Sequence, residues 1–360
     1  MLNKVRDNAG KIAALCRNEG IQYTVQYYFQ STFGKPIDSF ISVKAFRYHP
    51  SAKYAEMIRI PFDPESPLVS VIIPVYNGET YLQDTLESLK AQTLQNYEVI
   101  FVDDASTDHS VEMLRKAAEK DLRIRVIPKT HENAGASRNC GIQAAKGKYL
   151  LFLDSDDTFD PDLLAYPCDR GEQLDTQVVI FDADQLKLPE KIKTKPDWMK
   201  ATRHLPKKVF AGVDEPKGVY QTFNPWTKMF RRDYILREGF QFQSQYSSND
   251  VYFSVVALSA AERIATVPAR LVHYHVGRSG NIQSQKDKDP LCIYNAFAGA
   301  REELKRRNLL SIFDDALTAR AEESIRHEMD SLKSEAAKER LLDVLRSGGY
   351  ERLGIQNPEL

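Results

Sequence analysis

Between residues 68 and 154, fully apolar runs alternate with segments whose apolar residues recur at helical spacing. One helical segment places Leu82, Leu86 and Leu89 on a single face, at positions i, i+4 and i+7. Strands that are apolar throughout and separated by helices are typical of a parallel sheet covered on both faces. The predicted strands are residues 69–76, 97–104, 123–129 and 149–154, and the predicted helices are residues 81–94, 109–120 and 135–148.

After the fourth of these strands the alternation becomes less regular. Residues 178–184 predict one more strand, whereas residues 185–219, which are rich in Lys and Pro, predict a variable loop region. A further helix is predicted to begin near Asn249 or Asp250, and a further strand is predicted at residues 270–276. These elements extend the expected α/β domain.

Both ends of the chain differ from its middle. Residues 1–66 mix apolar and basic residues at loosely helical spacing, which favours a packing arm over an amphipathic helix resting on an anionic membrane. From about residue 289 the pattern predicts charged amphipathic helices that carry no chemistry. We expect an α/β domain at residues 67–285, between an N-terminal helical extension with a linker (1–66) and a C-terminal helical region (286–360).

Composition and charge exclude several classes of protein. The chain has 42% hydrophobic and 28% charged residues, as soluble globular proteins do. Its net charge of -1 argues against an overall positive electrostatic field that would attract nucleic acid. Its 4 cysteines lie far apart without CxxC pairing, so we expect neither a zinc site nor a disulfide framework. The sequence shows no signal peptide and no apolar run of about 20 residues. We therefore expect a cytoplasmic protein that is soluble or peripherally attached to the inner face of a membrane.

Polar residues follow three of the four predicted strands. The first strand ends in Pro74-Val75-Tyr76-Asn77-Gly78, the second in DDASTD (103–108) and the fourth in DSDD (154–157). In parallel sheets, ligands bind beyond the carboxyl ends of the strands, because the loops there are free to carry polar groups. The sequence therefore predicts one site formed by these strand ends.

The acidic run at residues 154–157 has a purely structural interpretation. Asp156, Asp157 or Thr158 would cap a helix beginning near Pro161, since carboxylates favour helix N-termini. That interpretation uses one acid and leaves the others close together. We assign the capping role to Asp157.

Three interpretations of the same run involve chemistry. A calcium loop of EF-hand type fails, because Phe159 and Ala165 stand where Gly and Glu are required. The pattern also matches haloacid dehalogenase phosphatases, but their motif lies on the first strand of the fold, and three β/α units precede it here. A metal site for a nucleotide diphosphate is favoured, because Asp154 and Asp156 can face one side and Mg²⁺ or Mn²⁺ takes carboxylate and phosphate oxygens.

Three segments, VSVIIPVYNGETYLQDTLESLKAQT, YEVIFVDDASTD and NAGASRNCGIQAAKGKYLLFLDSDD, resemble the family-2 glycosyltransferases of GT-A fold. The resemblance is specific from Leu68 to about Leu164 and looser to about Gln283. It implies a Rossmann-like, mainly parallel sheet flanked by helices, and a metal-dependent, inverting transfer from a nucleotide-sugar, expected to be a UDP-sugar. The enzyme would be a hexosyl- or N-acetylhexosaminyl-transferase acting on a glycan or lipid-linked acceptor in surface polysaccharide or glycoconjugate synthesis. The alternative is a non-catalytic nucleotide-sugar-binding or scaffold protein with the same fold.

The resemblance also assigns roles to the strand-end residues. Asp104 would accept a hydrogen bond from a uracil imide, Arg138 would face the diphosphate or its sugar, and Asp156 would bind the metal directly. For Gly78 and Asp108 we favour structural roles, as a turn former and a helix cap. The expected nucleotide-sugar-binding residues are Pro74, Tyr76, Asn77, Glu79, Asp103, Asp104, Arg138, Asp154 and Ser155, and the expected metal ligands are Asp154, Asp156 and His275.

The acceptor side lies downstream. Inversion requires a base that takes the proton of the acceptor hydroxyl. Asp250 matches the family's base, although Asn249 stands where the family usually has Glu. Asp250 would also cap the helix that begins there. Trp226 would offer an apolar plate and Lys228 a cation, while a core Trp226 and a solvated Lys228 are equally favoured. Beside these, the residues expected near the acceptor or diphosphate are Asn249, His273 and Arg278, with Ser279 next to Arg278 on a closing loop.

Overall fold

The structure is a computed structural model, and it describes residues 51, 53–187, 192–196, 199–277 and 285–356. Most of the predicted N-terminal extension, as well as Arg278 and Ser279, lies outside the described residues. The short helix α3 (Tyr54–Met57) precedes the first strand. No helix in the described part of the chain is both long enough and apolar enough to cross a membrane.

The first half of the domain is a parallel sheet, as predicted. Strand β1 pairs with β2 and with β4, and β2 pairs with β3, all in parallel. The strands and helices alternate along the chain and are β1 (Val69–Val75), α4 (Leu82–Lys90), β2 (Tyr97–Asp103), α5 (Ser110–Lys120), β3 (Ile124–Pro128), α6 (Ala134–Ala144) and β4 (Tyr149–Phe152). Strands β2 and β4 are buried along their whole length, which explains their continuous apolar sequence.

Helix α6 lies close against β1 because it carries a glycine at the contact. A Cβ at Gly141 would lie 2.3 Å from Ile72 Cγ2. Any larger residue would push the helix away from the sheet. This glycine therefore fixes how near α6, with its polar side chains, comes to the strand ends.

The second half adds antiparallel strands to the sheet, whose order is β3-β2-β1-β4-β8-β6-β9-β5, with β7 paired to β6. Strand β8 is antiparallel to both β4 and β6, while β9 runs parallel to β6 and antiparallel to β5. The elements of this second half are β5 (Thr158–Phe159), α7 (Ala165–Leu174), β6 (Val178–Lys187), β7 (Ile192–Thr194), β8 (Lys228–Arg231), α8 (Arg232–Glu238) and β9 (Ile264–Val276).

Two predictions for this half are wrong in detail. The helix expected near residue 161 begins at Ala165, because Thr158 and Phe159 pair with β9 first. The region 185–219, expected to be a loop, contains the end of β6 as well as β7 and the short helical turn η3 (Gly212–Asp214). The end of β6 pairs with the distant strand β9, and β7 folds back antiparallel on that end of β6. Pairing of this kind is not reported by a local composition rich in Lys and Pro.

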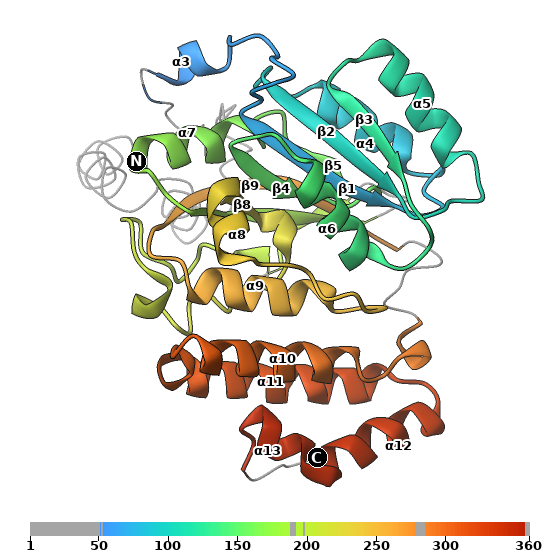
Figure 1. Ribbon diagram of the computed structural model, residues 1–360, viewed down its shortest axis with the longest axis vertical. Helices are drawn as coiled ribbons and strands as arrows, with labels where there is room; N and C mark the ends of the chain where they lie inside the picture. The colour runs from blue at the N-terminus through green and yellow to red at the C-terminus, as the bar shows by residue number, and fades with distance from the viewer. Residues whose placement is uncertain (1–50, 52, 188–191, 197–198, 278–284, 357–360) are drawn as a thin grey trace, which may run out of the picture. The chain divides into compact units, whose positions relative to one another are not determined.

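The remaining helices cover one side of the sheet. Figure 1 shows α9 (Asn249–Ser259) between the sheet and α10 (Cys292–Arg306), with α11 beyond α10. Helix α9 is buried on nearly all sides, and its Phe253 ring contacts those of Phe152 and Phe230 on the sheet. The sheet, α9 and the C-terminal helices share one hydrophobic core. The other elements are η4 (Pro225–Thr227), η6 (Lys286–Lys288), α11 (Leu310–Ser331), α12 (Glu335–Val344), η7 (Leu345–Gly349) and α13 (Tyr350–Leu353).

Candidate active site

The ends of β2 and β3 meet at a buried carboxylate, Asp104, which is 3% exposed. Its Oδ1 accepts hydrogen bonds from Lys129 Nζ at 2.6 Å and from the Glu132 backbone N–H at 3.0 Å. Nδ1 of His131 lies 3.0 Å from the other oxygen, Oδ2. The same nitrogen lies 3.0 Å from the Asp104 backbone carbonyl oxygen, which is its hydrogen-bond partner. Two donors from the segment after β3 therefore fix this carboxylate, and the His131 ring lies beside it. The sequence predicted Asp104 but not Lys129 or His131, because the third strand end carries no acidic or glycine-rich motif.

Tyr76, which follows β1, lies on the same edge. Its ring packs against that of His131, with centroids 4.4 Å apart and planes tilted by 31°. Tyr76 is 51% exposed, so the two rings form an aromatic surface open to solvent beside Asp104. The structure thus brings together two of the predicted nucleotide-binding residues.

Other predicted residues of this edge hold the loops in place. Asn77, at φ 51°, accepts a hydrogen bond from Thr107 N–H at 2.8 Å, and Glu79 accepts one from His109 N–H at 2.9 Å. Asp103 accepts a hydrogen bond from Ser106 N–H at 3.2 Å. The bonds of Asn77 and Glu79 join the loop after β1 to the loop after β2, while the bond of Asp103 lies within the turn after β2.

The structural roles expected for two neighbours are also visible. Asp108 accepts a hydrogen bond at 3.0 Å from the N–H of Ser110, the first residue of α5, although His109 holds the N-cap position of that helix. The Gly78 N–H donates to Ser110 Oγ at 2.8 Å within the same connection. Pro74 is partly buried within β1 itself.

Helix α6 carries residues that bond to both the end of β4 and the segment that includes the start of α9. Arg138, which is 6% exposed, donates from Nη1 to Asn249 Oδ1 at 2.8 Å and from Nη2 to Asp154 Oδ1 at 2.7 Å. Its neighbour Asn139 exchanges two hydrogen bonds of 2.8 Å with the backbone of Phe242. These contacts fix the start of α9 against the end of β4. Asn139 lies in the same sequence motif as Arg138, but no role was predicted for it.

A glycine permits this close approach. A Cβ at Gly135, in the first turn of α6, would lie 2.2 Å from the carbonyl oxygen of Gln243. The segment that leads into α9 therefore passes directly over the N-terminal turn of α6.

The predicted base, Asp250, lies in the first turn of α9 and is partly buried. Burial raises the pKa of its carboxyl above the usual range, and the nearby Arg138 guanidinium opposes that shift. Ser248 holds the N-cap position and makes no side-chain capping bond. Asp250 is thus held as a more basic carboxylate than a solvated aspartate would be.

Lys228 begins β8 and is 1% exposed, so the interpretation of a solvated lysine is wrong. The reason is that β8 lies inside the sheet, between β4 and β6. Its Nζ donates to the Asn224 carbonyl at 2.8 Å and to Thr227 Oγ1 at 3.1 Å. Burial lowers the pKa of Lys228 to about 7, while the charge of Asp250 opposes the shift.

The acidic loop after β4 is anchored from α4. The hydroxyl of Thr85 lies 2.9 Å from the Ser155 carbonyl and 2.8 Å from the Asp157 carbonyl. The Asp157 carboxylate accepts a hydrogen bond from the His275 backbone N–H at 2.9 Å. The prediction that Asp157 caps the following helix is therefore wrong, because that carboxylate joins the loop to β9 instead.

The donors at the end of β4 fit a divalent metal that is shared with a diphosphate. Mg²⁺ is usually held by one or two carboxylates, with waters and phosphates completing its shell. Asp154 and Asp156 supply two carboxylates, and the side chain of Asp154 is 30% exposed. Within the described ranges, no three His, Cys, Asp or Glu side chains are grouped closely enough to hold an ion. The expected trio with His275 is therefore not assembled in the structure.

The two histidines of β9 have different partners. His275 Nε2 lies 3.1 Å from Thr158 Oγ1, and the residue is 3% exposed. His273 Nδ1 lies 2.6 Å from Asp184 Oδ1 on β6. Asp184, which is buried, was not predicted, because a lone acid inside an apolar strand gives no motif.

Trp226 does not present an open face. It is 6% exposed and stacks on Tyr274, with ring centroids 5.8 Å apart and planes at 6°. Tyr274 is the more exposed ring of the pair. The core interpretation of Trp226 is therefore the better description.

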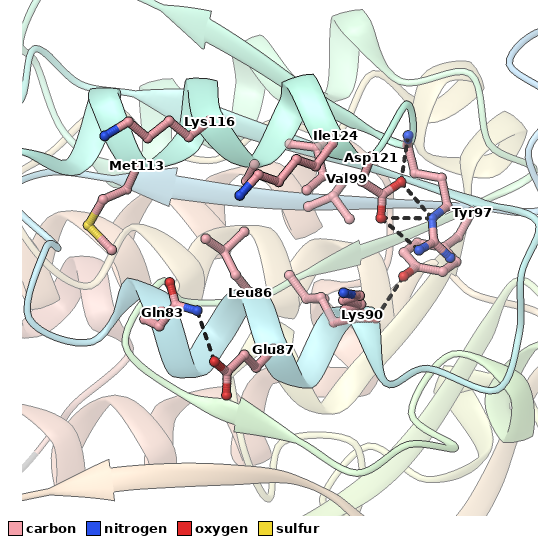
Figure 2. A pocket seen from close by; sticks show the side chains of 14 residues that line it. Gln83, Leu86, Glu87, Lys90, Tyr97, Val99, Met113, Lys116, Asp121 and Ile124 are labelled. Carbon is pink, nitrogen blue, oxygen red and sulfur yellow. Dashed lines mark hydrogen bonds and ion pairs between the residues drawn. The ribbon is translucent and has the colours of Figure 1, made fainter.

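A separate pocket of about 430 Å³ lies between α4 and α5 (Figure 2). Leu86 from α4 and Met113 from α5 point into it, and Lys116 on α5 also lines it. It reaches Tyr97 and Ile124, the first residues of β2 and β3, so it opens toward the amino ends of these strands. None of the residues predicted for the active site lines this pocket.

Known proteins resemble this chain in sequence. A family model described as "Glycosyl transferase family 2" matches residues 70–238. EpsH of Bacillus subtilis, which carries a glycosyltransferase name, is 31% identical over 255 residues, covering 66% of this chain and 70% of EpsH. EpsJ of the same organism, an uncharacterized glycosyltransferase, is 31% identical over 213 residues, covering 58% of this chain and 61% of EpsJ.

Solved structures resemble it in fold. TarS 1-349 of S. aureus in complex with UDP-GlcNAc superposes with a TM-score of 0.53 at 20% identity, covering 79% of this chain and 89% of that one. The mannosyltransferase PcManGT of Pyrobaculum calidifontis, in complex with GDP-Man and Mn2+, gives 0.51 at 16% identity, covering 84% and 88%. Similarity at this level of identity shows a shared fold.

Proposed function

Since the chain belongs to family 2 of the glycosyltransferases, we propose that it transfers a hexosyl or N-acetylhexosaminyl group from a UDP-sugar, with inversion, to a hydroxyl group of a glycan or lipid-linked acceptor. The UDP-GlcNAc of the TarS complex supports a donor of this chemical class. A lipid-linked acceptor would place the reaction at the cytoplasmic face of a membrane. Surface polysaccharide or glycoconjugate synthesis is the process that such acceptors serve.

The double hydrogen bond of Arg138 is the observation that carries this proposal. One guanidinium contacts both Asp154, at the end of β4, and Asn249, beside Asp250. A carboxylate suited to a metal diphosphate and a carboxylate suited to a base are thereby held on either side of one rigid group. An inverting transfer needs this arrangement, because the acceptor attacks from the face opposite the leaving diphosphate.

In the proposed reaction, Asp250 takes the proton of the acceptor hydroxyl as its oxygen bonds to the anomeric carbon. The bond from that carbon to the diphosphate oxygen breaks, and its electron pair leaves with the diphosphate. The raised pKa of Asp250 makes it a stronger base, provided that it is ionised. Because the pKa is raised, the rate should fall on acidification at a higher pH than for a solvated aspartate, whose pKa is about 3.9.

Asp154 and Asp156 would hold Mg²⁺ or Mn²⁺ in this scheme. When bound, the ion neutralises charge that develops on the leaving diphosphate. Arg138 contributes a positive charge that is present without the ion, since its Nη2 lies 2.7 Å from Asp154 Oδ1. The chain thus presents both a cation and a pair of carboxylates where the diphosphate is proposed to lie.

The nucleoside is proposed to lie at the other end of the same edge. Tyr76, which is 51% exposed, supplies an aromatic ring on which a nucleobase can stack, and Asp104 is an acceptor for an N–H group of that base. Asn77 and Glu79 act there indirectly, because their side chains hold the loop after β2.

A UDP-release assay with UDP-glucose, UDP-galactose and their N-acetyl forms, run with Mn²⁺ or with EDTA, tests the proposal. We expect release with at least one donor, dependent on the metal, and none with GDP-mannose. UDP binding without release from any donor, even with a mixed glycan and lipid-linked acceptor pool, would favour the non-catalytic binding protein. No binding of UDP or GDP would overturn the proposed donor class.

A further inference from the structure

The imidazole of His131 lies where a bound nucleobase is proposed to lie. It belongs to the segment between β3 and α6, and its side chain is 54% exposed. The ring packs against Tyr76 with centroids 4.4 Å apart and planes tilted by 31°. Its Nδ1 lies 3.0 Å from the Asp104 backbone carbonyl oxygen, its hydrogen-bond partner, and also 3.0 Å from Asp104 Oδ2. A planar ring is thus in contact with the tyrosine, and one of its nitrogens lies equally close to the backbone carbonyl and the carboxylate of Asp104.

The surroundings of Asp104 leave one carboxylate oxygen, Oδ2, for a hydrogen bond from a nucleobase. Oδ1 already accepts from Lys129 Nζ at 2.6 Å and from the Glu132 N–H at 3.0 Å. Asp104 is 3% exposed, and His131 Nδ1 lies 3.0 Å from its second oxygen, Oδ2. A donated hydrogen bond from a base would therefore be made to Oδ2, in competition with His131.

The stacking distance leads to the same conclusion. A centroid separation of 4.4 Å is that of two rings in contact, so a third ring does not fit between Tyr76 and His131. A nucleobase that stacks on the face of Tyr76 covered by His131 must first move the imidazole. The histidine and the base compete for one aromatic face and for one carboxylate oxygen.

We propose that His131 is an internal substitute for the nucleobase and that it leaves this place when the nucleotide binds. This inference rests on the proposed function, because it concerns the donor site of that reaction. A base that replaces the imidazole must bring its own N–H group to Asp104, as the imide of uracil does. His131 therefore lowers the affinity of the site for the donor and favours bases that carry such an N–H group.

Replacing His131 by alanine removes the competitor and keeps Tyr76 and Asp104. One hydrogen bond of ordinary strength together with one ring contact corresponds to about a fivefold to tenfold change in affinity. We expect H131A to bind UDP tighter by that factor in isothermal titration calorimetry. His327, an exposed histidine on α11, supplies the matched control, and H327A should bind UDP as the wild type does.

A second measurement uses the wild-type protein, so it does not depend on the stability of the variant. The Cε1–H resonance of His131, identified by its absence from spectra of H131A or of the near-isosteric H131N, should be shifted by the Tyr76 ring current. Titration with UDP should move it toward the position of an unstacked histidine.

The outcomes separate this inference from the proposed function. Weaker or unchanged UDP binding by H131A, or a His131 resonance that stays in place at saturating UDP, would overturn the inference while the donor class stands. If the nucleobase stacks on the face of His131 that points away from Tyr76, H131A would bind UDP more weakly than the wild type does. If UDP binds to neither protein, the proposed donor class fails, and this inference fails with it.

Discussion

Arg138→Lys tests whether one side chain couples the two halves of the site. The substitution keeps the positive charge, but a single ammonium group cannot replace two guanidinium nitrogens that bond to Asn249 and Asp154 at 2.8 and 2.7 Å. A hydrogen bond to a charged group contributes about 1.5–3 kcal/mol. Because the Asp154 side chain is 30% exposed, we take the lower end and expect about 1.5 kcal/mol of lost stability.

The effect on turnover should be larger than the effect on stability. If the start of α9 shifts by about 1 Å relative to β4, misplacement of Asp250 costs roughly tenfold to a hundredfold in kcat. The affinity for UDP should change less, since Tyr76 and Asp104 are untouched. Urea denaturation, calorimetric UDP binding and the UDP-release assay measure the three quantities.

The matched control is Arg326→Lys, because Arg326 forms an ordinary exposed ion pair with Glu322 on α11. It should leave stability, binding and turnover unchanged. A kcat for Arg138→Lys equal to that of the wild type, with normal folding, would show that the bridge does not position the base.

Three further predictions concern single groups. Lys228 has a pKa of about 7 when folded and about 10.4 when unfolded, so the unfolded state binds more protons between these values. The free energy of unfolding of the wild type should therefore rise by on the order of 1 kcal/mol per pH unit from pH 7.5 to 9. An equal rise in Lys228→Met would show that the lowered pKa of Lys228 is not its cause. Thr85→Val removes the hydroxyl that contacts the Ser155 and Asp157 carbonyls, and thermal unfolding should show a loss of about 1–2 kcal/mol; an unchanged Tm would argue against that anchor. Asp156→Ala should remove the dependence of UDP affinity on Mn²⁺, and calorimetry that still shows this dependence would exclude Asp156 as a ligand.

The sequence predicted the parallel half of the fold because local pattern determines it. The runs at β1, β2 and β4 are apolar throughout, and each is separated from the next by a helical segment. Strand β8 was not predicted, since its four residues were considered only as part of a motif. Its position between β4 and β6 depends on pairing with two distant strands, and that position also buries Lys228.

The strand-end residues could be predicted for a related reason. Parallel strands place their carboxyl ends on one edge, so polar residues after β1, β2 and β4 had to approach one another. His131 and Asn139 were not identified, because their partners are distant in sequence: Asn139 bonds to Phe242, 103 residues away. Asp157 was misassigned because β5 intervenes before the next helix.

The most direct test of the central claim is the turnover of Asp250→Asn with the donor that the UDP-release assay identifies. The amide is nearly isosteric with the carboxyl but cannot accept the proton. We predict a fall in kcat of about 10²- to 10⁴-fold, the usual contribution of a general base, with the dissociation constant for UDP unchanged within about twofold. Wild-type turnover in Asp250→Asn would contradict the account.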